Sequence, residues 1–128
     1  MTEINAFTKN VKTLLDNKKY SIEFYQREYK WGKDQIVELL TDLEDKFFEE
    51  YEENHERSNV KKYPQYFLGS IILVDKNDQT FVIDGQQRLT SITLILIYIY
   101  RKFGNTEQKQ NLLNLIYSDT YGEKNFNL

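Results

Sequence analysis

Apolar residues recur with a helical period in three segments of the chain. From Lys33 onward they return every three or four positions, and most acidic residues fall on the opposite side, which predicts a long amphipathic helix. The apolar residues that define this helix are Ile36, Leu39, Leu40, Leu43, Phe47 and Tyr51. A short helix that ends near residues 16–17 is predicted after Thr8 as its N-cap. A last helix, followed by a polar end, is predicted after Thr106 as its N-cap.

Extended segments lie between these helices. Residues 66–74 and 80–83 are rich in apolar and β-branched residues, and the polar residues 75–79 separate them, which predicts a β-hairpin. A short extended piece is predicted at residues 20–22. Residues 54–62, followed by the only proline, Pro64, predict a linker.

The run 89–103 is apolar on nearly every side. Its length favours a helix buried within the domain, although its isoleucines and threonines also suit a strand. Asp84 and Gly85 precede it and end the second strand of the hairpin. The whole pattern predicts an α+β fold, in which residues 1–128 form a single domain or part of one.

Composition narrows the class of protein. The 128 residues contain no cysteine, which excludes disulfides, thiolate metal sites and a cysteine nucleophile. The chain starts without a signal-peptide pattern, and its longest uncharged apolar run, residues 89–100, is shorter than the roughly 20 residues of a membrane span. We therefore predict a cytoplasmic protein with no membrane partner. The net charge is −3, but half of the acidic residues lie between Asp34 and Glu56, so charge neither supports nor excludes a phosphate ligand elsewhere.

Candidate chemistry lies where the second strand meets the apolar run. A helix that starts there presents unpaired N–H groups and a positive dipole end, both of which attract anions. Gly85 allows close approach of a ligand, Gln86 and Gln87 offer amides, Arg88 offers a planar fork for phosphate oxygens, and Asp84 is suited to a cap or a divalent ion. The pattern equally fits an ordinary helix start with a capping aspartate, solvated glutamines and a surface ion pair.

A second amide and guanidinium pair, Gln26 and Arg27, lies in an aromatic segment that has no regular period. Tyr25 and Trp31 flank the pair and are candidates for stacking on a base, or for closing the edge of the core. If this loop lies next to the segment 84–88, Arg27 and Arg88 face the same anion. The glycines form neither a P-loop nor a Rossmann fingerprint, and the single histidine, His55, has no ligand-spaced partner and is expected to be solvated.

Carboxylates of the acidic helix are an alternative place for metal or acid-base chemistry. Most of them lie opposite the leucines, so they are expected to be solvated rather than catalytic. Asp42, Glu44 and Asp45 are the first candidates if that expectation fails.

Three blocks of sequence resemble one family. They read FYQREYKW at 24–31, FLGSI at 67–71 and VIDGQQRLT at 82–90, and in this order they resemble the N-terminal domain of GmrSD-type, modification-dependent restriction endonucleases and related phage-defence proteins. The resemblance implies a ParB- and sulfiredoxin-like fold, a small mixed β-sheet with a hairpin flanked by helices. One departure is that Ile22, Glu23 and Phe24 stand where the family usually has a proline before the tyrosine-glutamine-arginine run.

The resemblance implies a domain that binds and hydrolyses a nucleoside triphosphate with Mg²⁺, and couples this to recognition or cleavage of modified DNA by a C-terminal nuclease region. That region is expected to lie outside this chain. The phosphate-binding residues implied are Gln26, Arg27, Gly85, Gln86, Arg88 and Thr90. The catalytic residues are Asp84, Gln87 and Arg88, with Asp84 also as metal ligand. The alternatives are a module that binds a nucleotide or a DNA phosphate without hydrolysis, and a purely structural interaction domain.

Overall fold

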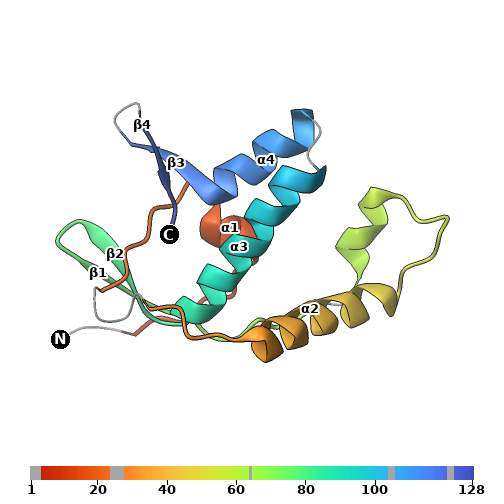
Figure 1. Ribbon diagram of the computed structural model, residues 1–128, viewed down its shortest axis with the longest axis horizontal. Helices are drawn as coiled ribbons and strands as arrows, with labels where there is room; N and C mark the ends of the chain where they lie inside the picture. Colours follow the sequence, from red (N-terminus) through yellow and green to blue (C-terminus); the bar gives the residue numbers. More distant parts are fainter. Residues whose placement is uncertain (1–3, 24–27, 64, 104–105, 121–122) are drawn as a thin grey trace. The chain divides into compact units, whose positions relative to one another are not determined.

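The computed structural model describes residues 4–23, 28–63, 65–103, 106–120 and 123–128 (Figure 1). Its contacts divide the chain into two compact units. The first comprises Met1–Arg27 and Ile71–Leu128, and the second comprises Glu28–Ser70. The first unit contains α1 (Val11–Leu15), the hairpin of β1 (Ile72–Lys76) and β2 (Gln79–Asp84), α3 (Gln86–Phe103), α4 (Thr106–Ile116) and the hairpin of β3 (Tyr117–Thr120) and β4 (Glu123–Phe126). The second unit contains α2 (Lys33–Phe48) and the 3₁₀ helix η2 (Arg57–Lys62). The fold is therefore α+β, as the sequence pattern predicts.

The hairpin of the first unit pairs β1, Ile72–Lys76, with β2, Gln79–Asp84, in antiparallel register. Its two turn residues, Asn77 and Asp78, have φ angles of 53° and 61°. Positive φ at both positions is typical of a type I′ turn, and asparagine and aspartate tolerate this region better than other side chains do. The predicted hairpin is confirmed, with a turn two residues long in place of the predicted 75–79.

The predicted first strand is wrong in its first half. Residues 66–71 form no strand, and β1 begins only at Ile72. Gly69 has a φ of 115°, a left-handed conformation that a β-strand does not use. The glycine therefore interrupts an apolar run that the pattern alone presents as continuous.

Segment 20–22 adds a parallel partner to β2. Ser21 forms a parallel bridge with Phe81, in which the Ser21 N–H donates to the Thr80 carbonyl at 2.8 Å and the Val82 N–H donates to the Ser21 carbonyl at 2.9 Å. Pairing around β2 is thus parallel on one side and antiparallel on the other. This agrees with the extended piece predicted at 20–22 and with a mixed arrangement of strands.

Helix α3, Gln86–Phe103, occupies the predicted apolar run. Leu89 and Ile92, near its start, are buried, whereas Leu94 and Tyr98 are largely exposed, so the expectation of a wholly buried helix is wrong. Its 18 residues span about 27 Å, and the described helix that it contacts most is the shorter α4, Thr106–Ile116.

The N-caps differ from the predicted residues. Helix α1, Val11–Leu15, has Asn10 as its N-cap, whose Oδ1 accepts a hydrogen bond from the Thr13 N–H at 2.8 Å. Thr8 lies two residues too early to do this. Thr106 is the first residue of α4 and therefore belongs to the helix itself.

The C-terminal hairpin was not expected from the polar sequence that forms it. β3, Tyr117–Thr120, pairs antiparallel with β4, Glu123–Phe126. The buried Asn127 then joins distant segments, because its side-chain amide donates to the carbonyls of Leu15 at 2.8 Å and Asn114 at 3.0 Å. These carbonyls belong to the last turns of α1 and α4, and each also accepts a backbone hydrogen bond, Leu15 from the Lys18 N–H at 3.2 Å and Asn114 from the Asn17 N–H at 2.9 Å. The Asn127 carbonyl also accepts from the Tyr20 N–H at 2.7 Å.

The second unit is built on α2, Lys33–Phe48, the predicted amphipathic helix. Its N-terminus is fixed by a hydrogen bond of 2.9 Å from the Gly32 N–H to Gln35 Oε1, and Leu39 is its buried residue. Tyr51, predicted to extend the helix, lies beyond its end. The predicted linker 54–62 contains a 3₁₀ helix, η2, Arg57–Lys62, and Pro64 is outside the described residues.

Candidate functional site

The motif 84–88 occupies the junction between β2 and α3. Gly85 has a φ of 94°, and a Cβ atom added to it would lie 2.9 Å from Ile71 Cγ1. Both observations require glycine, since other residues rarely adopt this conformation and the space is already filled. The backbone at the start of α3 is therefore held in a tight turn against Ile71.

Asp84 is not the cap of α3. It is the last residue of β2, opposite Ile72, and the carbonyl that accepts the first helical hydrogen bond belongs to Gly85, which receives it from the Leu89 N–H at 3.0 Å. The Asp84 carboxylate is exposed, and it makes no hydrogen bond or ion pair with any residue that the structure describes. It remains accessible to a ligand at the end of the strand.

The Gln86 amide is engaged in the fold. Its Nε2 donates to the carbonyls of Ile83 at 2.7 Å and Val82 at 3.3 Å, which ties the first residue of α3 back to the end of β2. Only its Oε1 is left for a ligand. This arrangement could not be read from the sequence, in which Gln86 and Gln87 look alike.

Gln87, Arg88 and Thr90 are all partly buried in the first turns of α3. The Gln87 carbonyl accepts a hydrogen bond from the Ser91 Oγ at 2.7 Å, within the helix. The Arg88 guanidinium has no carboxylate within ion-pair distance among the described residues. The surface ion pair considered for Arg88 is thus not found in that part of the chain.

Tyr25, Gln26 and Arg27 lie outside the described residues, so their meeting with the segment 84–88 stays a prediction. The last described residue before them, Glu23, forms an ion pair with Lys76 of β1, with 3.5 Å between Oε1 and Nζ. Trp31 is partly buried and belongs to the second unit.

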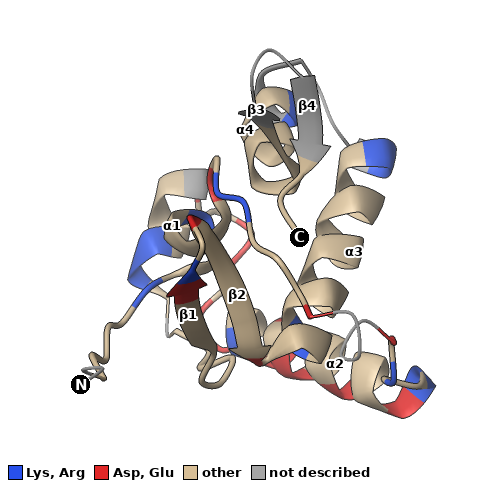
Figure 2. Cartoon of the chain, turned by 90° about the vertical axis from the view of Figure 1, so that its left-hand side faces the viewer, with Lys and Arg blue, Asp and Glu red and all other residues tan. Residues whose placement is uncertain are grey.

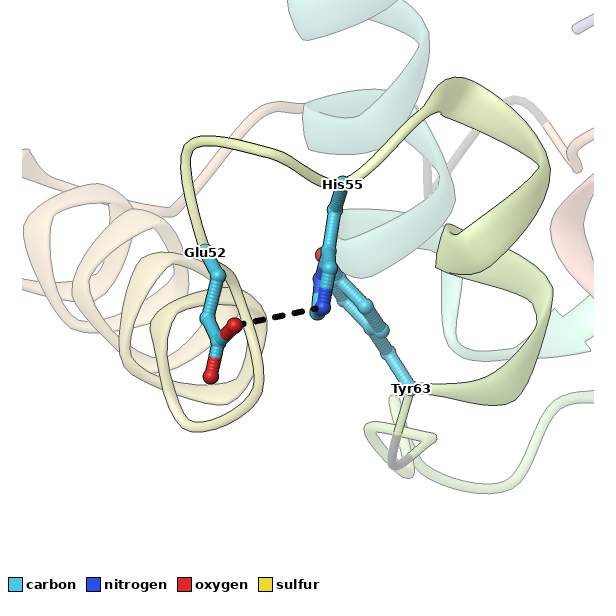
Figure 3. A network of polar contacts seen from close by, with 3 residues as sticks. All are labelled: Glu52, His55 and Tyr63. Atoms are coloured by element: carbon cyan, nitrogen blue, oxygen red, sulfur yellow. Dashed lines mark hydrogen bonds and ion pairs between the residues drawn. The ribbon is translucent and has the colours of Figure 1, made fainter.

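His55 is partly buried and has two polar neighbours, whereas the sequence predicted a solvated side chain. Its Nδ1 lies 2.7 Å from the Tyr63 hydroxyl, and its Nε2 lies 3.8 Å from a Glu52 carboxylate oxygen (Figure 3). The Tyr63 ring also contacts Phe47, with 5.4 Å between centroids. Desolvation, with smaller contributions from Tyr51, Glu50 and Glu52, raises the pKa of Tyr63 above 10.0. This group closes the segment after α2 back onto the helix.

Carboxylates of α2 form no metal site in the described structure. Asp42 accepts a hydrogen bond from the Tyr66 hydroxyl at 3.0 Å, while Glu44 and Asp45 are exposed. Across the described ranges, no group of three or more histidine, aspartate or glutamate side chains is placed to hold a metal ion. No helix in these ranges has the length and apolar character that a membrane span needs.

Comparison with known protein families identifies the family of this chain. The family model described as "GmrSD restriction endonuclease, N-terminal domain" matches residues 11–127. This range includes the pair Gln26 and Arg27, the segment 84–88, the two hairpins and Asn127. Comparisons with curated proteins and with solved structures find no match, so the ParB- and sulfiredoxin-like fold stays a prediction.

Proposed function

The chain belongs to the family of GmrSD restriction endonuclease N-terminal domains, and on this premise we propose that its β2–α3 junction binds the phosphates of a nucleoside triphosphate and hydrolyses it with Mg²⁺. Family membership makes the protein part of a restriction-type defence system. The proposal adds that nucleotide turnover is coupled to recognition or cleavage of modified DNA by a nuclease region, in the same chain or in a partner.

Arg88 carries this proposal. A partly buried guanidinium without a counter-charge in the described structure is costly, because desolvation weakens its hydration and no carboxylate compensates. A phosphate oxygen compensates well, since a guanidinium donates two parallel hydrogen bonds to it. Arg88 lies in the first turn of an 18-residue helix, where the dipole and the backbone N–H groups favour an anion as well.

Asp84 fits the role of metal ligand. Mg²⁺ usually takes one or two carboxylates from a protein and its other ligands from phosphate oxygens and water, so a single exposed carboxylate beside the phosphate site is sufficient. When bound, Mg²⁺ neutralises part of the phosphate charge. The role we assign to Gln87, in the same turn as Arg88, is to orient a water molecule, and Gln86 holds the turn itself.

A binding experiment tests the phosphate site. Calorimetry with ATP, GTP, CTP and UTP in the presence of Mg²⁺ should show that Arg88→Ala weakens binding by about 10- to 100-fold, the usual range for a lost charge-assisted hydrogen bond, with little change in melting temperature. Lys18→Ala removes an exposed positive charge elsewhere in the same unit and should bind as the unaltered protein does. A large drop in melting temperature with unchanged affinity would show that Arg88 is structural.

Phosphate release separates an enzyme from a binding module. The protein should release phosphate from a nucleoside triphosphate in Mg²⁺, and Asp84→Asn should bind the nucleotide but turn it over far more slowly, because the amide is a poor metal ligand. Binding without hydrolysis, with or without Asp84, would favour the alternative in which the nucleotide is a switch. Salt-sensitive binding of DNA in place of nucleotide, lost in Arg88→Ala, would favour a DNA-phosphate site.

A further inference from the structure

The chain returns from the second unit to the first at the candidate site. This return lies between Ser70 and Ile71. Ile71 lies directly against Gly85, because a Cβ atom added to Gly85 would be 2.9 Å from Ile71 Cγ1 and 3.4 Å from Ile71 Cα. The next residue, Ile72, pairs with Asp84. The first two residues after the second unit therefore contact the start of the proposed phosphate site.

The segment just before Ile71 has little to hold it in one conformation. Residues 65–71 belong to no helix or strand, and residues 67–70 form no backbone hydrogen bond with any residue that the structure describes. Gly69 has a φ of 115°, and glycine adopts many backbone conformations at little cost. Rotation within residues 67–70 therefore breaks no hydrogen bond of a helix or strand.

The end of β1 that receives this segment is irregular. Its register with β2 shifts between Ile72 and Leu73, and Ile72 is 51% exposed. A shift of this kind interrupts the ladder of hydrogen bonds, so this end is held less firmly than the regular pairs that follow it. Figure 2 shows β1 beside β2 and α3 continuing from β2. Packing of Ile71 on Gly85 is therefore important for holding the end of β1 at the start of α3.

We infer that a ligand at the β2–α3 junction restricts the orientations of the second unit through the contact between Ile71 and Gly85, an inference that rests on the proposed phosphate site. A phosphate bound by Arg88 and the first N–H groups of α3 stabilises the turn at Gly85, with its φ of 94°. Ile71 packs on this turn, so the ligand favours the arrangement in which Ile71 is docked over one in which it is detached. When Ile71 is docked, the free part of this connection is shortened to residues 67–70. The second unit then samples fewer orientations.

Distances between labels in the two units test this inference. The chain contains no cysteine, so Glu38→Cys on α2 and Asn111→Cys on α4, both at exposed positions, provide the only sites for spin labels. Double electron–electron resonance gives the distribution of distances between them. With Mg²⁺ and ATP, GTP, CTP or UTP in turn, the distribution should become narrower for each nucleotide that calorimetry shows to bind.

Variants of Ile71 test the contact itself. Ile71→Ala removes the Cγ1 atom nearest to Gly85, so it should broaden the distribution without nucleotide and abolish the narrowing at saturating nucleotide. Because coupling is reciprocal, it should also weaken nucleotide binding by about 5-fold or more. Ile71→Val keeps Cα, Cβ and Cγ1 and should behave as the unaltered protein does. Val74→Ala is the matched control, because it shortens an apolar side chain of the same strand that lies opposite Phe81, and it should change neither measurement.

Calorimetry on the labelled proteins separates this inference from the proposed function, and circular dichroism checks that each variant is folded. A nucleotide that binds without narrowing the distribution overturns the inference and leaves the phosphate site in place. If no nucleotide binds, the proposed function fails, and the distribution for Ile71→Ala decides the rest. A broader distribution for this variant supports the link from the junction to the second unit, whereas an unchanged one overturns it.

Discussion

Gly85 shows how one residue sets the geometry of the β2–α3 junction. Gly85→Ala should lower the melting temperature clearly, because a left-handed backbone costs an L-residue about 1–2 kcal/mol and the new methyl group meets Ile71 at 2.9 Å. Ile71→Ala in the same chain should recover part of the loss, that due to the clash. Gly32→Ala is the control, since its Cβ meets only Gln35 Oε1 at 3.4 Å and its φ is ordinary. Equal losses for the two glycines would contradict this account.

Tyr20 links the stability of the first unit to pH. Its ring is buried, its hydroxyl donates to the Leu14 carbonyl, and desolvation raises the pKa of this phenol above 10.0. A folded-state pKa above the unfolded value means that the stabilisation is complete below about pH 10 and is lost as the pH rises through the folded-state pKa. Urea unfolding between pH 8 and 11 should therefore show a steeper loss for the unaltered protein than for Tyr20→Phe.

The exposed Tyr98 provides the control for this measurement. Tyr98→Phe should keep the steep dependence on pH, because its hydroxyl is not buried. If Tyr20→Phe is as steep as the unaltered protein, the alkaline loss arises from other groups.

At the scale of the element, the local pattern predicts helices and hairpins well and their ends less well. α2, α3 and the first hairpin follow from period and turn residues alone. The ends depend on contacts that a pattern does not contain, such as the Asn10 cap and the conformation of Gly69. The second hairpin was missed because its residues are polar and its place is fixed by Asn127, whose partner Leu15 is 112 residues away.

The candidate site, too, could be predicted from the sequence only in part. Its position at a strand-to-helix junction follows from the sequence, because a glycine and polar residues stand between a strand pattern and an apolar run. The separate roles of Gln86 and Arg88 do not follow from the sequence, because they depend on which carbonyls and carboxylates lie near each side chain in the fold. Gln26 and Arg27 retain their predicted roles, which the described structure neither supports nor opposes.

Tyr63 tests how the segment after α2 is held. Tyr63→Phe keeps the ring contact with Phe47 but removes the hydroxyl that meets His55 Nδ1, so amide exchange in η2 should become faster and the melting temperature slightly lower. Tyr51→Phe is the matched control, because its ring stacks on Phe47 and no hydrogen bond of its hydroxyl is found in the described structure. Equal exchange in both variants would show that the rings alone close this segment.

At the scale of the whole molecule, Asn127 connects elements from both ends of the chain. Asn127→Ala removes two side-chain hydrogen bonds to the carbonyls of Leu15 and Asn114, which keep the backbone N–H groups of Lys18 and Asn17 as donors, so urea unfolding should show a loss of about 1–3 kcal/mol in total. Asn111→Ala, on the exposed side of α4, should change stability little. A loss for Asn127→Ala no larger than that for Asn111→Ala would show that the side-chain hydrogen bonds of Asn127 contribute little to stability.

The place of Asn127 also bears on how the protein is made. Asn127 is hydrogen-bonded to the ends of α1 and α4 and to the Tyr20 N–H. The ribosome adds Asn127 more than a hundred residues after Leu15. Closing so long a loop is slow compared with forming local turns and helices. The nascent chain can therefore form its first hairpin early, but it cannot complete the core of the first unit until Asn127 has left the exit tunnel. Folding of this unit is therefore completed only after its last residues have been synthesised.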